Sequence, residues 1–481
     1  MEALHMLLRA VAPLSESPQP EPHNTYPIIL VHGFGGWGRD EGLLLTYWGG
    51  VQGDLQELLR AQGHIVLTAS VGPFSSNWDR ACELYAQIKG GRVDYGEHHA
   101  AAHGHSRFGR TFPGLYPQWS NVNKIHLVGH SMGGQTIRML THMLARGTRG
   151  APEEEDAASH PLFTGEKHWV HSVTTISTPN QGTLLADGFS EVGNLVKNAM
   201  VGVFSTLGLS GALMDAYHDV QLGQWGIKPR QPDEAFTTYW RRVFRSNIFK
   251  PGFRDVALWS LSTPGAADEN MWVETLSHVF YFSYANVDTY ARQDEWLREM
   301  HEPNALTMLL PLQPLARFLG GEYCLKHGFS SDWQANDGVV PTASMRTDAI
   351  GDSVAFAGVP VRGKWNVMPL LHIDHLAVIG QTLHTPIVPL YEFHARLLQE
   401  LPVHEQPDDT QVARGVHYMA KLAQVTAAMN RAETAADVAV KYASTVHQLA
   451  WAYCKTALKA KHRQQQAEAW GKPACSSSAA E

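Results

Sequence analysis

A serine stands at position 131 in the pentapeptide GHSMG, residues 129–133, which matches the pattern G-x-S-x-G. The apolar run at 125–128 precedes it, and a helix-prone stretch at 135–140 follows it. A strand that turns sharply into a helix through two glycines holds a serine at a strained turn, with its hydroxyl exposed for attack on a carbonyl carbon. This context predicts that Ser131 is a nucleophile.

A serine nucleophile needs a base that takes its proton and an acid that orients the base. In proteins with this strand-turn-helix pattern, the chain order is Ser, then Asp or Glu, then His. Asp337 lies in the turn-like segment NDGVVP at 336–341, and His375 lies in the loop-like segment HIDH at 372–375. The 26 histidines of the chain offer many other candidates. Chain order and local context together favour Asp337 and His375.

The loop HGFGGWG at 32–38 follows the first apolar run of the chain directly. A loop in this place supplies one backbone donor to an oxyanion, and the residue after the nucleophile supplies the other. The predicted donors are therefore the amides of Phe34 and Met132. The alternative interpretation is a glycine-rich turn with no part in the chemistry.

A second group of polar residues comprises Asp79 and four histidines at positions 98, 99, 103 and 105. Imidazole and carboxylate ligands at such separations can close a tetrahedral zinc site. A histidine-rich surface loop without a metal is the competing interpretation, and spacing alone does not decide between the two.

The elements that position these residues follow from the apolar pattern. Strands are expected at 26–31, 64–68, 125–128 and 170–176. Because helical segments separate them, the pattern predicts an α/β fold with a mostly parallel sheet. Residues 182–214 alternate small and apolar positions at helical spacing, which fits either core helices or a mobile lid. The lid region is expected at about 182–245. The acidic run at 153–156 is expected to be a solvated loop without function.

Composition changes along the chain predict its domain organisation. We expect a flexible segment at 1–25, a catalytic domain at 26–401 with an insert at about 75–115, a helical extension at 402–470 and a disordered tail at 471–481. The extension has two apolar stripes at helical spacing, which predict a helical hairpin that packs against the catalytic domain rather than binding a cofactor or a membrane.

The bulk properties of the 481-residue chain exclude several classes of function. A net charge of −8 without a basic run argues against nucleic acid as a partner. No apolar stretch reaches the roughly 18 residues that cross a bilayer. The first residues contain no signal peptide, so the default expectation is a cytoplasmic protein. The sequence predicts no particular protein partner.

Taken together, these motifs resemble the large lipases of the thermoalkaliphilic Bacillus/Geobacillus group and their staphylococcal relatives. The matching blocks are HGF at 32–34, YWGG at 47–50, the stretch from VGPFSSNWDR at 71–80 to RFGR at 107–110, GHSMGG at 129–134, NDG at 336–338 and DHL at 374–376. The resemblance implies an α/β-hydrolase fold with a lid that opens at lipid interfaces. It also implies hydrolysis of triacylglycerol or similar esters through Ser131, Asp337 and His375.

The resemblance extends to metals. The family binds zinc in an inserted subdomain through two aspartates and two histidines, and three of these positions match here as Asp79, His99 and His105. The fourth aspartate aligns with Thr237, so the resemblance leaves Asp233, Glu234 or a water molecule to complete a structural zinc site. The family's calcium site has no counterpart, because Ala377 and Thr382 stand where carboxylates would be needed. We therefore expect no calcium there.

The leading hypothesis is a serine lipase that acts on lipid esters at an interface. An esterase or a polar-lipid acyl hydrolase, acting on phospholipid or galactolipid, is the alternative within the enzymes. A non-catalytic lipid-binding protein is the alternative outside them, and the complete set of candidate catalytic residues argues against it.

Overall fold

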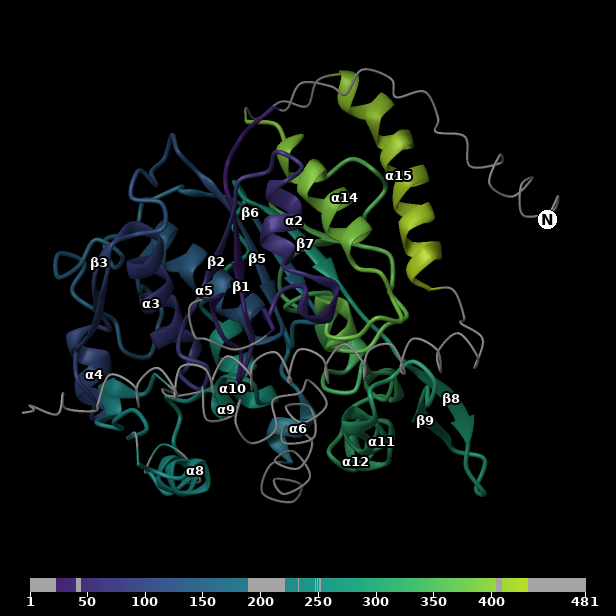
Figure 1. Ribbon diagram of the computed structural model, residues 1–481, viewed down its shortest axis with the longest axis horizontal. Coiled ribbons are helices and arrows are strands. Elements are labelled where there is room, and N and C mark those ends of the chain that lie inside the picture. Colours follow the sequence, from purple (N-terminus) through teal and green to yellow (C-terminus); the bar gives the residue numbers. More distant parts are fainter. Residues whose placement is uncertain are drawn as a thin grey trace, which may run out of the picture.

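The computed structural model describes residues 23–39, 45–188, 221–403 apart from 232, 247, 249 and 251, and 409–430. At its centre is a seven-stranded sheet in the order β10-β11-β7-β6-β5-β1-β2, and each neighbouring pair is parallel (Figure 1). The strands are β1 (Ile28–Val31), β2 (Val66–Ala69), β5 (Ile125–His130), β6 (Val170–Ile176), β7 (Phe280–Tyr284), β10 (Ser353–Ala355) and β11 (Trp365–Val367). The predicted parallel α/β sheet is confirmed.

Helices cover both faces of this sheet, which explains why its inner strands are apolar throughout. The helices that cover the sheet are α2 (Leu55–Arg60), α3 (Asn77–Lys89), α5 (Met132–Arg146) and α14 (Val388–Gln399), and α15 (Asp409–Met429) packs on α14. Because successive side chains of a strand point to opposite faces, Ile28 and Leu30 pack with α2 and α14, whereas Ile29 and Val31 pack with α3 and α5.

The helix α15 lies over α14 on the outer side of the molecule (Figure 1). Its buried residues Tyr418, Leu422, Val425 and Met429 join the core formed by α14 and the sheet. This helix corresponds to the first half of the predicted helical hairpin, and its apolar stripe packs against protein. The second half, and the predicted tail at 471–481, lie outside the described residues. Among the described helices, none is long and apolar enough to span a bilayer.

Two excursions leave the sheet. The first comprises α3, β3 (Gly91–Asp94), α4 (Glu97–His103) and β4 (Phe108–Phe112), in which β3 and β4 pair antiparallel. The second is an antiparallel hairpin of β8 (Thr289–Gln293) and β9 (Glu299–Pro303), which packs beside α11 (Gln313–Gly320) and α12 (Tyr323–Lys326) (Figure 1).

Short helices complete the face of the molecule that the carboxyl ends of the strands reach. They are α6 (Leu184–Asp187), α8 (Phe236–Phe244), α9 (Ala257–Ser260), α10 (Thr263–Asn270) and α13 (Thr342–Arg346). The predicted lid region at about 182–245 includes α6 and α8, and its middle part, 189–220, lies outside the described residues.

Candidate active site

Ser131 lies between the end of β5 and the start of α5, at the turn that the sequence predicts. Its backbone adopts φ 55° and ψ −132°, a conformation that costs free energy for a residue with a side chain. The amide of Ser131 donates to Ile176 O at 2.9 Å, which fixes the turn against β6. Its side chain makes no capping hydrogen bond to α5. The hydroxyl is therefore not used to satisfy the helix that follows it.

The glycines on either side of Ser131 are needed because the turn leaves no space for a Cβ atom. A Cβ on Gly133 would lie 2.3 Å from Val31 O, and one on Gly129 would lie 2.4 Å from the carbonyl carbon of Gly133. Strand β1 and helix α5 thus approach each other at backbone distance, which only glycine permits.

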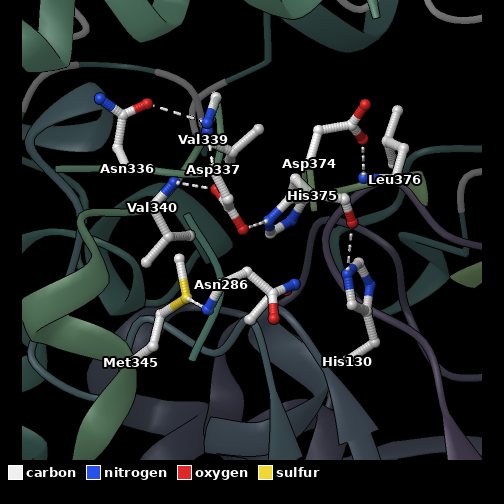
Figure 2. A network of polar contacts seen from close by, with 12 residues as sticks. His130, Asn286, Asn336, Asp337, Val339, Val340, Met345, Asp374, His375 and Leu376 are labelled. Atoms are coloured by element: carbon white, nitrogen blue, oxygen red, sulfur yellow. Dashed lines mark hydrogen bonds and ion pairs between the residues drawn. The ribbon is translucent and has the colours of Figure 1, made fainter. Parts of the chain in front are cut away.

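Asp337 and His375 come together although 37 residues separate them in the chain. His375 Nδ1 donates to Asp337 Oδ2 at 2.8 Å, and the His375 amide donates to Asp337 O at 2.9 Å (Figure 2). The other carboxylate oxygen, Oδ1, accepts from the amides of Val339 and Val340 at 3.0 and 2.8 Å. A proton on Nδ1 leaves Nε2 of the neutral ring as the acceptor, which is the tautomer that a general base needs.

The loop that carries Phe34 is held by a fully buried arginine. Arg80 of α3 donates to the carbonyl oxygens of His32 and Gly72 and to Thr136 Oγ1 on α5. His32 ties the same loop to the end of β2, because its Nδ1 donates to Gly33 O and its Nε2 accepts from the Val71 amide. Burial and the nearby Arg80 charge lower the pKa of His32 to about 3, so the ring is neutral.

The loop of Phe34 lies against the turn of Ser131 and Met132, because a Cβ on Gly33 would be 2.7 Å from Ser131 Cβ and the Phe34 side chain packs on the small apolar cluster that contains Met132. The Met132 amide is in the first turn of α5, where backbone N–H groups have no acceptor within the helix. On either side of Phe34, the Gly33 amide donates to Tyr47 Oη and the Gly35 amide to Pro73 O. This arrangement orders the loop around the Phe34 amide.

A buried chain of hydrogen bonds connects this loop to His375. The Gly33 amide donates to Tyr47 Oη at 2.9 Å, and Tyr47 Oη lies 2.6 Å from His130 Nδ1. His130 Nε2 lies 2.9 Å from His375 O, and the two rings are 4.7 Å apart (Figure 2). Because a carbonyl only accepts, Nε2 carries the proton and Nδ1 accepts from the tyrosine. Burial keeps the pKa of His130 well below its usual value, so its ring stays neutral.

The loop after His375 is fixed by hydrogen bonds of the Asp374 and Gln381 side chains. Asp374 Oδ1 accepts from the amides of Leu376 and Ala377, and its Oδ2 accepts from the Leu309 amide. Gln381 Nε2 donates to Thr46 O and Tyr47 O, at 3.1 and 2.9 Å. The expectation that no calcium binds around Ala377 and Thr382 stays a prediction.

Asp79, His99 and His105 meet in a buried cluster, and Asp255 is its fourth member. One ligand atom from each residue lies within 4.8 Å of those of the other three. His99 Nε2 is 3.4 Å from Asp79 Oδ1 and 3.3 Å from Asp255 Oδ1, while His105 Nε2 is 3.3 Å from Asp255 Oδ2. A ring of two carboxylates and two imidazoles around one point can hold a metal ion.

The environment of the cluster orients its members. His105 Nδ1 donates to Ser106 O, which leaves Nε2 as a free lone pair, and Gln224 Nε2 donates to Asp79 Oδ2. Trp78 stacks on the His99 ring at 4.7 Å. Burial lowers the pKa of His99, but the carboxylates of Asp255 and Asp79 outweigh it and raise this pKa to about 10.

The expected fourth ligand is corrected by the structure. Asp233 is exposed, and Glu234 forms an ion pair with Arg242 at 2.9 Å, so neither joins the cluster. Thr237 lies in α8, whereas Asp255 lies just before α9. The expectation of Asp233 or Glu234 as fourth ligand was wrong, because no sequence pattern marks Asp255. Asp255 lies far along the chain from Asp79 and reaches the cluster only through the fold.

The acidic run at 153–156 is also not merely solvated, because Glu155 is buried. Its Oε2 accepts from the amides of Glu97 and His98, and its Oε1 accepts from the His99 amide. Helix α4 begins at Glu97, and Gly96 before it has no side chain to cap the helix. Glu155 satisfies these first amides from a distant loop and so positions the helix that carries His99.

The other histidines of the region lie at the edge of the cluster. His98 is exposed, and its Nδ1 donates to Glu154 O. His103 Nε2 lies 3.6 Å from Glu153 Oε1. Sequence reasoning therefore found three of the four cluster members and missed Asp255. It also missed Tyr47 and Glu155, which have no local motif.

Comparison with known proteins places this geometry in a family. The family model described as "Lipase-like, C-terminal domain" matches residues 24–411. The chain belongs to this family. Lipase 2 of Staphylococcus aureus is 35% identical over 413 residues, and the match covers 82% of this chain and 56% of that relative. The chain thus spans little more than half the length of this relative.

Two solved structures share the fold. EstA from Clostridium botulinum is 39% identical with a TM-score of 0.71, over 81% of this chain and 90% of that chain. Lipase 1 from Pelosinus fermentans is 43% identical with a TM-score of 0.68, over 79% of this chain and 99% of that chain. The predicted α/β-hydrolase fold and the predicted kinship with staphylococcal-type lipases are confirmed.

Proposed function

We propose that this chain is a serine hydrolase that cleaves the carboxylic ester bonds of triacylglycerol or a similar lipid. The observation that carries the proposal is the 2.8 Å pair of His375 Nδ1 and Asp337 Oδ2 at the face where Ser131 occupies its strained turn. Membership of the lipase-like family supports the substrate class.

In the proposed mechanism, Ser131 Oγ attacks the ester carbonyl carbon while its proton moves to His375 Nε2. The negative charge on the carbonyl oxygen is held by the amides of Phe34 and Met132, and Asp337 stabilises the imidazolium. The tetrahedral intermediate collapses, the alcohol leaves with the proton from Nε2, and an acyl-enzyme remains. Water, deprotonated by His375, then attacks the acyl carbon. The bond from this carbon to Ser131 Oγ breaks, Oγ takes the proton back from Nε2, and the fatty acid leaves.

The decisive experiment compares the wild type with Ser131→Ala on emulsified long-chain triglyceride and on a soluble short-chain ester. The alanine variant should lose at least about 10³-fold in kcat on both substrates, with an unchanged melting temperature. Labelling of the wild type by a fluorophosphonate should disappear in the variant. Substantial turnover by Ser131→Ala would reject the assignment. Preference for phospholipid over triglyceride would redirect the substrate class to polar lipids.

We further propose that the cluster of Asp79, His99, His105 and Asp255 binds zinc in a structural role. Six nitrogen and oxygen atoms of its imidazoles and carboxylates are buried without a hydrogen-bond partner among the described residues, a state that a coordinated cation would relieve. Four protein ligands leave no open position for substrate. Metal analysis of protein purified without added zinc should find about one zinc per chain, and a value near zero would contradict the proposal.

A further inference from the structure

The hairpin of β8 and β9 ends in two large apolar side chains that face solvent. Trp296 is 74% exposed and Leu297 is 77% exposed. Leu297 also has φ 60°, a left-handed conformation in which glycine or asparagine is the usual residue. A leucine in this conformation is strained. Because Leu297 is exposed, it gains no packing within the fold that would offset the strain.

The turn that presents these side chains is rigidly built. Asp294 Oδ1 accepts from the amides of Trp296 and Arg298, at 2.8 and 2.9 Å. The amide of Leu297 donates to Asp294 O at 3.1 Å, and the amide of Asp294 donates to Arg298 O at 3.0 Å. The backbone that carries the apolar pair is thus held in one conformation, and little backbone entropy remains to be lost when the tip binds a surface.

The base of the hairpin is attached to the loop of the proposed catalytic acid. The Asp288 amide donates to Asn336 O at 2.9 Å, and the Asn336 amide donates to Thr289 Oγ1 at 3.1 Å. Asn336 is the residue directly before Asp337. On the other side, α11 approaches β9 so closely that a Cβ on Gly320 would lie 2.0 Å from His301 O. The hairpin therefore extends from the body as a braced arm beside α11 and α12 (Figure 1).

The charges near the tip indicate which kind of surface it contacts. The five charged residues around the apolar pair are Arg292, Asp294, Glu295, Arg298 and Glu299. They sum to about −1, and Arg298 is paired with both Asp294 and Glu322. A tip without excess positive charge has no attraction to anionic lipid. Tryptophan, in contrast, is favoured at the boundary between water and lipid.

We propose that Trp296 and Leu297 insert into an uncharged lipid surface and hold the active-site face against it. This inference rests on the proposed function, because a lipid ester substrate supplies such a surface. The arm then orients the protein so that the loop of Asp337, at the base of the hairpin, faces the substrate layer.

The first test measures binding without hydrolysis. The full chain carrying Ser131→Ala is mixed with triolein droplets coated with phosphatidylcholine, and the bound fraction is measured by flotation. Adding Trp296→Ser with Leu297→Asn should weaken binding about tenfold, since two inserted apolar side chains are lost. The matched control is Val122→Ser, because Val122 is 78% exposed but precedes β5, at the opposite end of this strand from Ser131. The control should bind as the parent does.

The second test separates anchoring from stability. Leu297→Asn alone relieves the left-handed strain, so its melting temperature should equal or exceed that of the parent while droplet binding falls. A structural role for Leu297 predicts a lower melting temperature instead. Coating the droplets with phosphatidylserine should not strengthen binding.

Two results would overturn the inference: unchanged droplet binding in the double variant, or an equal loss in Val122→Ser. With Ser131 intact, the double variant should keep its kcat/KM on a soluble short-chain ester within about twofold of the wild type. If the wild type itself hydrolyses no soluble ester, the proposed function fails, whereas the droplet-binding result still decides the anchoring proposal.

Discussion

The proposed catalytic centre and the histidine–aspartate cluster both bring aspartate and histidine together in buried surroundings, but they differ in how their polar atoms are satisfied. Asp337 accepts from His375 and from two backbone amides. In the cluster, both ring nitrogens of His99 and both carboxylate oxygens of Asp255 lack a hydrogen-bond partner among the described residues.

This difference shows which site is complete without a ligand. A buried polar group without a partner costs about 1–3 kcal/mol, so a cluster of them is stable only if an ion or a proton fills it. The proposed catalytic centre is held by its own hydrogen bonds. The cluster is held by charge, and a bound cation would satisfy its buried atoms.

Asp337→Asn should cause the largest loss of activity, because it alters the hydrogen bonds of the proposed catalytic centre. The amides of Val339 and Val340 would bind the carboxamide oxygen, which turns the NH2 group toward His375 Nδ1. That donor would force the proton of His375 onto Nε2, and a protonated Nε2 can no longer accept the proton of Ser131. We expect kcat to fall about 10³- to 10⁴-fold with little change in KM. Steady-state kinetics on a soluble ester check this, and a loss below tenfold would contradict the assignment.

The cluster should depend on its cation instead. A strong chelator should lower the free energy of unfolding by roughly 4 kcal/mol, which is the stabilisation expected when free metal exceeds Kd about 1,000-fold. In Asp255→Ala the chelator should have almost no further effect. The matched control is Asp233→Ala, because Asp233 is exposed and outside the cluster. Thermal unfolding with and without chelator checks the prediction. An Asp255→Ala protein as sensitive as the wild type would contradict it.

A buried histidine outside both sites, His394, should respond to pH through its burial alone. His394 is buried between Thr174 Oγ1 and Tyr284 Oη, and burial lowers its pKa to about 3. In the unfolded chain His394 binds a proton near pH 6.5, whereas in the folded chain it stays neutral until about pH 3. The free energy of unfolding therefore falls as the pH drops from 6.5 toward 3. Between pH 7 and 4.5 this group alone should cost about 2 kcal/mol. Urea unfolding should show a correspondingly smaller acid loss in His394→Gln, and an identical loss would refute the prediction.

The smallest expected effect concerns Tyr47, which donates to His130 behind the catalytic centre. Tyr47→Phe removes the donor to His130 Nδ1 and the acceptor of the Gly33 amide. We expect kcat to fall about three- to tenfold and stability to fall by about 1 kcal/mol. Tyr281→Phe serves as control, since its hydroxyl accepts only from the Leu276 amide at the other end of the sheet. It should lose similar stability without losing activity, and equal losses of activity in both would argue against a positioning role for Tyr47.

Features marked by a local sequence pattern or by chain order could be predicted, whereas contacts between residues distant in the chain could not. The strands around Ser131 are apolar throughout because helices cover both faces of the sheet, so local pattern was sufficient. The pairing of Asp337 with His375 followed from chain order. Asp255 and Glu155 could not be found in this way, because each acts on residues of α3 or α4 that are distant in the chain and has no motif around it.

The close approach of β1 and α5 has a consequence for how such chains evolve. Gly129 and Gly133 are required by space at a backbone contact, whereas Ser131 is required only by the proposed chemistry. Selection for a stable fold alone would therefore retain both glycines after the serine had been replaced. In a descendant that had lost catalysis, the flanking glycines would persist as a trace of the ancestral enzyme.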